Sequence, residues 1–368
     1  MSGHLSSIRR MFPGGNTSLG FFSFYDQIIK ADAARVFLLK GGPGVGKSTF
    51  MRQIGETMLQ EGYDLEYHHC SSDPSSLDAL VIPKLQTAII DGTAPHVVDP
   101  KNPGVVEEIL NLGDFWNESG LKKDKDQIIQ VNKKIKDCFN RAYTYLRIAG
   151  EIHKDLISLN QKAVRLEILY KLAAEIRGKI FGENSLTTHT FSTDHRKLFA
   201  SAITPNGLVN YLETIFKAGN GEDERIFILE GPPGCGKELI LRNLLMATIE
   251  KGYGTETFYC PLHPEKPEHL YLPQLKTGVI SSHYPHKYAG NKGAEVINLA
   301  PLLLPGDELA KEAMREDELV YDDLLEKAIS WLKRAKNLHD KLEAFYIPHM
   351  DFADLEELRK KTVARILS

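Results

Sequence analysis

The alternation of apolar and polar residues follows the same order twice along the chain. Each copy begins with a short apolar run rich in β-branched and aromatic residues, which predicts a buried strand leading into a glycine-rich segment. A stretch with apolar residues at helical spacing comes next, and two more apolar runs predict strands separated by a polar loop with prolines. This alternation predicts a mostly parallel sheet with helices on its faces. The predicted strands are residues 35–40, 64–70 and 86–91 in the first copy and 225–230, 255–260 and 276–281 in the second.

The two copies align so consistently that they identify a tandem duplication. The shift changes only slightly along the chain, and a period of this length indicates repeated domains, because solenoid repeats are only about 20–50 residues long. Matched pairs are Arg9 with Arg196 (196 − 9 = 187), Gly41 with Gly231 (231 − 41 = 190), Cys70 with Cys260 (260 − 70 = 190) and His153 with His339 (339 − 153 = 186).

The end of each copy has a different composition from its beginning. Residues from about 122 to 181 and from about 308 to 367 are rich in Lys, Glu, Leu and Ala, and they predict a helical hairpin appended to each half. The fold expected is therefore α/β, with two tandem domains of the same architecture. We expect the hairpins to pack on their own half or on the other half, and a protein-binding arm is the alternative. The expected domains are 1–187 (core 1–120) and 188–368 (core 188–307).

Composition restricts the kind of partner. The 368 residues are 42% hydrophobic and 26% charged, as in ordinary globular proteins, and the formal net charge of −4 does not indicate nucleic-acid binding. No apolar run approaches the length of a membrane helix, and the start has no apolar segment of signal-peptide type. The four cysteines are widely spaced, so a disulfide framework is not expected. These features predict a cytoplasmic protein.

The first glycine-rich segment, GGPGVGKST, is a complete phosphate-binding loop of the form GxxxxGK[ST]. Glycines let the backbone turn its N–H groups toward a phosphate, and the positive end of the following helix points at the same anion. Lys47 is expected to bind the β- and γ-phosphates of a nucleoside triphosphate, and Ser48 is expected to ligate Mg²⁺. The residues expected to contact nucleotide are Gly41, Gly42, Pro43, Gly44, Val45, Gly46, Lys47, Ser48 and Thr49.

Carboxylates near the strand ends complete the expected site. Asp91 ends the third predicted strand and is assigned to magnesium, with a simple turn residue as the alternative. Asp73 and Asp78 follow the second predicted strand, where either could position the attacking water or an acceptor hydroxyl, or be an ordinary loop residue. His96 follows the third strand in a Pro-His turn, where it either senses the γ-phosphate or forms hydrogen bonds within the turn. The expected catalytic set is Lys47, Asp91, Asp78 and His96.

The second loop, GPPGCGKEL, keeps the phosphate side of this site and loses the metal side. Glu238 stands in place of Ser48, and Ser281 stands in place of Asp91. A glutamate beside a polyphosphate is opposed by Coulomb repulsion, so we expect weak or different nucleotide binding with little or no turnover. The expected contacts of this loop are Gly231, Pro233, Gly234, Cys235, Gly236, Lys237 and Glu238.

Several other features are weighed against simpler interpretations. Cys235 lies inside the second loop, where the helix end favours a thiolate and suggests redox sensitivity. The neighbouring histidines His68 and His69 fit no zinc signature. No glutamate directly follows Asp91, which argues against rapid hydrolysis. The arginines that are candidates for a phosphate-directed finger, by charge alone, are Arg147, Arg165 and Arg196.

Through the first loop, Asp91 and their strand–loop–helix context, the chain resembles the P-loop NTPase superfamily. More closely, it resembles a bacterial family of tandemly duplicated P-loop ATPases, over essentially its whole length. This resemblance implies an ATP-binding fold and a cytoplasmic location, but no particular substrate. Glu238 and Ser281 depart from the catalytic pattern.

These observations predict a slow Mg²⁺-dependent ATPase in the first half and a regulatory or structural second half. Two alternatives stay open. One is a phosphotransferase, with His96, Asp73 or Asp78 facing an acceptor, and the other is a nucleotide sensor that engages a protein partner without turnover.

Overall fold

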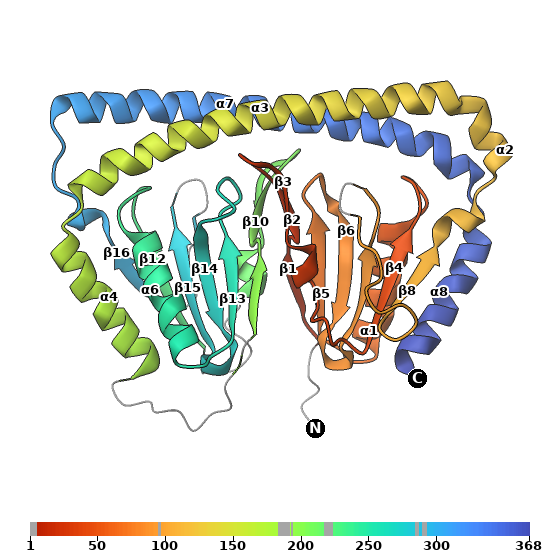
Figure 1. Cartoon of the computed structure of the whole chain (residues 1–368), viewed down its shortest axis with the longest axis horizontal. Coiled ribbons are helices and arrows are strands. Elements are labelled where there is room, and N and C mark those ends of the chain that lie inside the picture. The colour runs from red at the N-terminus through yellow and green to blue at the C-terminus, as the bar shows by residue number, and fades with distance from the viewer. Residues whose placement is uncertain are drawn as a thin grey trace.

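The computed structural model describes residues 6–94, 97–182, 192, 194–216, 224–283, 287–288 and 293–368. Its framework is a pair of six-stranded mixed sheets, one from each half of the chain. The sheets stand side by side beneath two long helices (Figure 1). The α/β class and the mostly parallel sheets expected from the sequence are therefore present.

The strands of the first sheet are, in spatial order, β1 (Ile8–Met11), β5 (Leu65–Cys70), β6 (Asp73–Ile82), β7 (Thr87–Asp91), β4 (Arg35–Lys40) and β8 (Glu107–Asn111). β4 precedes the first glycine loop and lies between β7 and β8, parallel to both. β1 is parallel to β5, whereas β6 is antiparallel to β5 and to β7. The prediction of a polar loop between the second and third strands was wrong, because β6 occupies that segment.

The second sheet repeats this order. Its strands are β16 (Glu295–Asn298), β12 (Arg225–Glu230), β15 (Thr277–Ser282), β14 (Pro267–Leu272), β13 (Thr255–Tyr259) and β9 (His195–Leu198). Each strand takes the place of its sequence counterpart, with β12 between β15 and β16 and with β14 antiparallel to both neighbours. The duplication seen in the sequence thus extends to the topology.

The two halves meet through their N-terminal strands. Arg9 of β1 and Arg196 of β9 lie between two buried carboxylates, Glu66 of β5 and Glu256 of β13, and each arginine pairs with both. Beside this ion cluster, Phe12 and Phe199 form an antiparallel bridge. A small hairpin follows this bridge in each half. One is formed by β2 (Gly14–Thr17) with β3 (Gly20–Ser23), and the other by β10 (Ser201–Thr204) with β11 (Gly207–Asn210).

The helix after each glycine loop packs on its own sheet. These helices are α1 (Lys47–Gln60) and α6 (Lys237–Glu250), and α1 buries Phe50, Met51 and Ile54 against Phe37 of β4. Two short helices, α2 (Glu118–Leu121) and α5 (Leu212–Ile215), complete the connections. Among the described residues, no helix has both the length and the apolar character that crossing a membrane requires.

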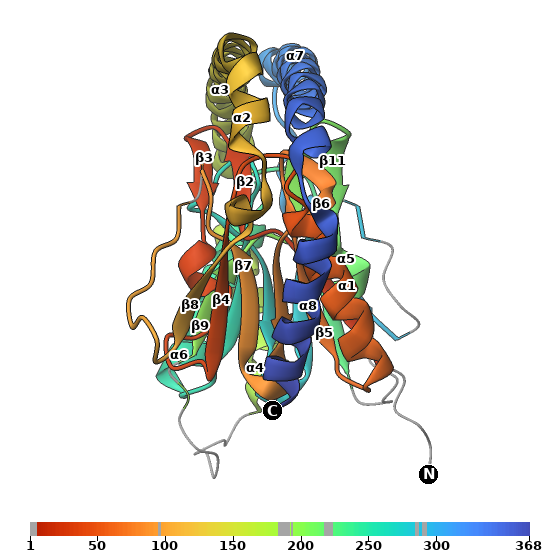
Figure 2. The ribbon, with the colours of Figure 1, turned by 90° about the vertical axis from the view of Figure 1, so that its right-hand side faces the viewer.

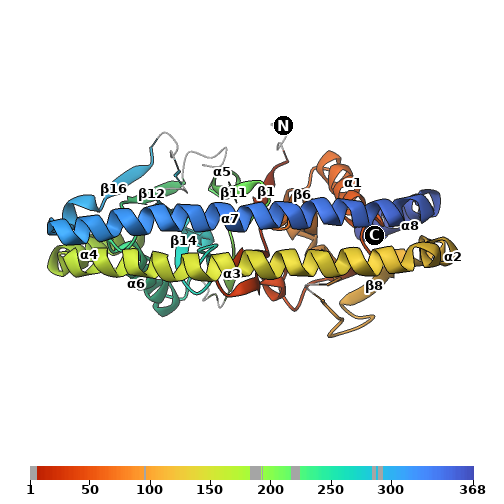
Figure 3. The ribbon, with the colours of Figure 1, turned by 90° about the horizontal axis from the view of Figure 1, so that it is seen from above.

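The C-terminal part of each half crosses over to the other half. Two helices of 39 residues, α3 (Lys125–Ala163) and α7 (Glu308–Tyr346), run side by side and antiparallel across both sheets (Figures 1 and 3). An end-on view places them above the sheets (Figure 2). The shorter helices α4 (Leu166–Phe181) and α8 (Phe352–Leu367) then descend along the sheets.

Core packing shows that the two tails are exchanged. Leu169 of α4 belongs to the core of the second half, with Phe227 and Ile240, whereas Leu355 of α8 belongs to the core of the first half, with Phe37. The helices of each tail diverge and contact different parts of the molecule, so they do not form the expected hairpins. Of the two expected packing modes, the structure shows packing on the other half.

Candidate functional site

Both glycine loops adopt the same backbone conformation. Gly44 and Gly46 have φ of 70° and 87°, and Gly234 and Gly236 have φ of 80° and 109°. Positive φ is readily available only to glycine, which explains why the repeat retains these residues. No side chain caps the first turn of α1 or of α6. The N–H groups at the start of each helix therefore form the kind of surface that binds an anion.

In the first half, Lys47 and Ser48 lie between the loop and the strand ends. Lys47 Nζ donates hydrogen bonds to the carbonyl oxygens of Gly41 (2.8 Å) and Gly42 (2.9 Å), and it lies 3.7 Å from Asp91 Oδ2. Ser48 Oγ accepts a hydrogen bond from the backbone N–H of Leu77 in β6 (3.0 Å). The structure thus brings the expected phosphate-binding lysine to the expected metal-binding aspartate.

A second carboxylate accompanies Asp91. The β6–β7 register pairs Ala79 with Ile90, and extending it by one residue places Asp78 opposite Asp91. Asp78 is buried, and burial together with Asp78 and other nearby groups raises the pKa of Tyr25 well above its ordinary value. The expectation that Asp78 lies in a loop was wrong, but its strand position brings it beside Asp91. Two carboxylates and a hydroxyl supply the oxygen ligands that Mg²⁺ prefers.

Asp73, at the start of β6, contacts the exchanged tail. Its Oδ2 lies 3.3 Å from Lys336 Nζ of α7, and its Oδ1 accepts hydrogen bonds from Ser75. Burial opposes ionisation of Asp73, but Ser75 and the charge of Lys336 outweigh it and lower the pKa. Asp73 therefore holds the second half's tail at the edge of the first site.

The exchanged tails also cover the glycine loops, which the sequence did not reveal. A Cβ on Gly42 would lie 3.1 Å from Tyr346, and one on Gly44 would lie 3.0 Å from the carbonyl oxygen of Glu343. The tail residues that contact the two loops are 186 positions apart, which is the shift that aligns the two tails in the sequence. The internal alignment could therefore have suggested that both tails have the same role. The corresponding contacts in the second half are Ile157 with Gly234, Leu169 with Gly236, and a hydrogen bond of 2.8 Å from Asn160 Nδ2 to the carbonyl oxygen of Pro233.

The second loop has different side-chain surroundings. Lys237 is 6% exposed and donates to the carbonyl oxygens of Gly231 and Pro232, and burial lowers its pKa. Glu238 pairs with Arg242 at 2.7 Å. Ser281, in place of Asp91, offers no carboxylate.

The counterpart of Asp78 is Glu268, which keeps a carboxylate next to the second loop. It is 3% exposed, and its Oε1 lies 3.0 Å from His283 Nε2. Only one of the two expected carboxylate positions is therefore acidic in the second half.

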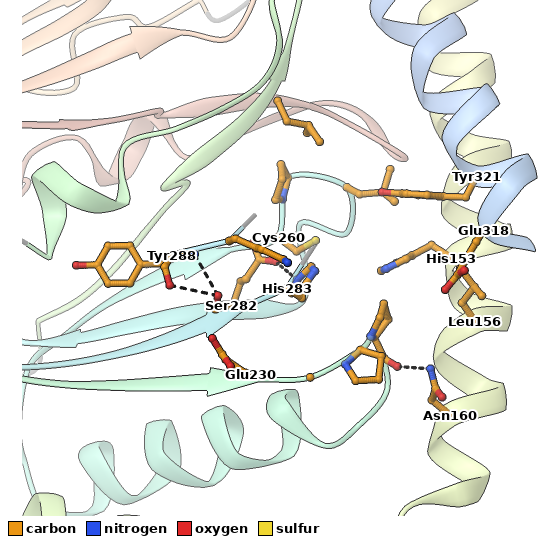
Figure 4. Close-up of a pocket in the computed structure, with 18 of the residues that line it drawn as sticks. His153, Leu156, Asn160, Glu230, Cys260, Ser282, His283, Tyr288, Glu318 and Tyr321 are labelled. Carbon is orange, nitrogen blue, oxygen red and sulfur yellow. Dashed lines mark hydrogen bonds and ion pairs between the residues drawn. The ribbon is translucent and has the colours of Figure 1, made fainter. Parts of the chain in front are cut away.

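Two cavities flank the second loop. One of about 750 Å³ lies between the edge of the second sheet and helices α3 and α7 (Figure 4), and one of about 500 Å³ lies over Gly234, Gly236 and Lys237. Glu268 and His283 line both cavities. Residues from opposite halves therefore enclose space next to the second glycine loop.

Other expected positions have different outcomes. His96 and its counterpart His286 lie outside the described residues. Cys235 is fully buried, with Lys237 Nζ 3.7 Å from its Sγ. Arg196, a candidate finger by charge, is held in the ion cluster between the halves and does not face either loop.

Possible metal ligands cluster elsewhere as well. Among the described residues, His339, Asp340 and Glu343 of α7 are the group of three whose ligand atoms lie within 4.8 Å of one another.

Neither the scan against protein-family models nor the searches of curated proteins and solved structures found a match to this chain. The geometry of the site therefore provides the basis for a functional proposal.

Proposed function

We propose that the first half binds ATP with Mg²⁺ and hydrolyses it slowly, and that the second half is a regulatory or structural copy. The observation that carries this proposal is that Lys47 lies beside Asp91, with Asp78 opposite Asp91 in the sheet and Ser48 in the uncapped first turn of α1. The second half offers Lys237 but has Glu238 and Ser281 at the metal positions. Phosphate binding is supported in both halves, and metal binding is supported in the first.

Each residue has a definite part in the proposed reaction. The loop N–H groups and Lys47 bind and orient the phosphates, and this positioning with charge compensation supplies most of phosphoryl-transfer catalysis. Ser48 and Asp91 would hold magnesium, which polarises the γ-phosphoryl group when bound. Asp78, buried next to Asp91, orients the attacking water. No glutamate directly follows Asp91, so turnover is expected to be slow.

The two loop lysines provide the test. Lys47→Ala should lower ATP turnover by roughly 100-fold or more, because it removes a charge that stabilises the transition state. Lys237→Ala should change turnover much less, and circular dichroism should confirm that both variants are folded. Equal losses from the two substitutions would contradict the functional asymmetry. Turnover measured without any added acceptor also distinguishes hydrolysis from phosphotransfer.

Magnesium dependence gives a second readout. Asp91→Asn removes one negative ligand and should raise the Mg²⁺ concentration needed for half-maximal turnover. Ser281→Asn is the matched control, since it changes the equivalent position of the second half. An unchanged magnesium requirement in Asp91→Asn would remove Asp91 from the metal site.

A further inference from the structure

The larger cavity of the second half has a charge opposite to the one a polyphosphate requires. Its described lining includes the carboxylates of Glu230, Glu268, Glu318 and Asp322, but one lysine, Lys287, and no arginine. Among the described residues, no cation forms an ion pair with Glu230, Glu318 or Asp322. The carboxylates of the lining would repel the negative charges of a polyphosphate, so this cavity disfavours a nucleoside triphosphate.

Two of these acidic positions are basic in the first half. Glu230 corresponds to Lys40 (230 − 40 = 190), and Asp322 corresponds to Lys136 (322 − 136 = 186). Tail contacts at both loops follow the shift of 186, so the structure supports this alignment. Lys40 itself pairs with Asp99 at 2.9 Å. Two positions have thus changed from basic to acidic between copies of one architecture.

The remaining lining suits the apolar part of a small molecule. Leu156 of α3 and Tyr321 of α7 line the cavity on its helix side (Figure 4). Leu262 is also part of the lining. The volume of about 750 Å³ falls in the range of about 300–1,000 Å³ that is common for ligand sites. Among the lining residues, the buried Glu268 is paired with His283.

Two paired histidines next to the cavity, His153 of α3 and His263 of the loop between β13 and β14, do not offset these carboxylates. His153 Nδ1 lies 3.0 Å from His263 Nε2. Burial, with the neighbouring histidines and Lys266, lowers the pKa of His153 to about 3, and burial with Lys266 and Lys154 lowers that of His263 to about 4. Both rings are therefore neutral near pH 7.

We propose that this cavity binds a small organic cation, an amine or guanidinium attached to an apolar group. The ammonium or guanidinium would lie by the carboxylates that α7 contributes to the lining, Glu318 and Asp322, and the apolar group would pack on Leu156 and Tyr321. This site would make the second half a receptor for a ligand other than nucleotide. The proposal stands independently of ATP hydrolysis by the first half.

Three probes with one scaffold and different charges test the proposal on the full-length chain. Phenethylamine, 2-phenylethanol and 3-phenylpropionate carry a cation, a neutral hydroxyl and an anion on similar phenylalkyl groups. Isothermal titration calorimetry should show the amine binding at least about tenfold more tightly than the alcohol, and the acid binding most weakly. No preference for the amine, preference for the acid, or no binding of the amine at millimolar concentration would overturn the proposal.

Charge reversal on the cavity wall locates the binding. Asp322→Lys should weaken amine binding about tenfold or more, whereas Glu326→Lys, an exposed position of the same helix outside the cavity, should leave it nearly unchanged. Asp322→Asn is a second variant in case charge reversal prevents folding, and it should weaken amine binding in the same direction. Equal effects of Asp322→Lys and Glu326→Lys would overturn the assignment. Lys47→Ala should bind the amine as the wild type does, so a failure of the ATPase proposal would not obscure this result.

Discussion

At the scale of single residues, the two loops differ in side chains while their backbones agree. The glycines share positive φ in both copies, but Glu238 is engaged by Arg242, and Ser281 replaces the carboxylate of Asp91. The sequence predicted this difference, because the loop motif is local and the repeat aligns its two copies. It did not predict that Asp78 adjoins Asp91, because that proximity depends on pairing between strands.

The glycines of the second loop provide a prediction about stability. At Gly236, φ is +109° and an added Cβ would lie 2.5 Å from Leu169, whereas Gly62 has φ of +84° with nothing within 4 Å. Gly62→Ala should therefore lower the free energy of unfolding by roughly 1–2 kcal/mol from backbone strain alone. Gly236→Ala should lower it by roughly 1–3 kcal/mol more, because Leu169 must also move. Urea unfolding measures both, and equal losses would show that the contact with α4 contributes little.

At the scale of elements, local pattern identified the strands and helices that carry regular apolar spacing. It failed at β6, where DPSSLDALVI begins with turn-forming residues and resembles a loop. The segment becomes a strand because β5 and β7 satisfy its hydrogen bonds on both sides. The tails were recognised as helical, but their apolar faces do not specify which sheet they cover.

Helix α4 provides the prediction at this scale. Leu169 is 1% exposed and packs over the second loop, so Leu169→Ala should lower the free energy of unfolding by about 2–5 kcal/mol through lost burial and a residual cavity. Leu166→Ala, at a position 51% exposed on the same helix, is the matched control. Chemical denaturation of the two variants should separate them clearly. If they are equally stable, α4 is not an integral part of the second half's core.

At the scale of the whole molecule, exchanged tails and a shared ion cluster join the halves. Burial opposes ionisation of Glu66, but Arg196, His68 and Arg9 outweigh it and hold the pKa of this carboxyl well below its ordinary 4.5. A carboxyl with a lowered pKa stabilises the fold at pH values above the ordinary pKa. That contribution is lost as the pH falls below 4.5 toward the lowered value.

Glu66→Gln tests the ion cluster. Near pH 7 it should lower the free energy of unfolding by about 3–5 kcal/mol, because Arg9 and Arg196 lose a buried partner. The variant should also lose less stability than the wild type as the pH falls below 4.5, since it lacks the titrating group. Glu167→Gln, which breaks an exposed pair with Lys171, should cost less than about 1 kcal/mol. Unfolding curves at several pH values measure this difference. If the free energies of unfolding of Glu66→Gln and of the wild type changed in parallel with pH, the stabilising role of ionised Glu66 would be contradicted.

The sequence by itself determined the duplication, the two glycine loops, their flanking strands and helices, and the differences between the copies at positions 48/238 and 91/281. These features depend on residues close together in the chain and on direct comparison of two copies. Only the tertiary structure decided that β6 is a strand, that Asp78 lies beside Asp91, and that each tail covers the other half's loop. Such contacts join segments far apart in sequence. The apolar face of a tail helix shows that the helix packs against another surface, but it does not specify which surface.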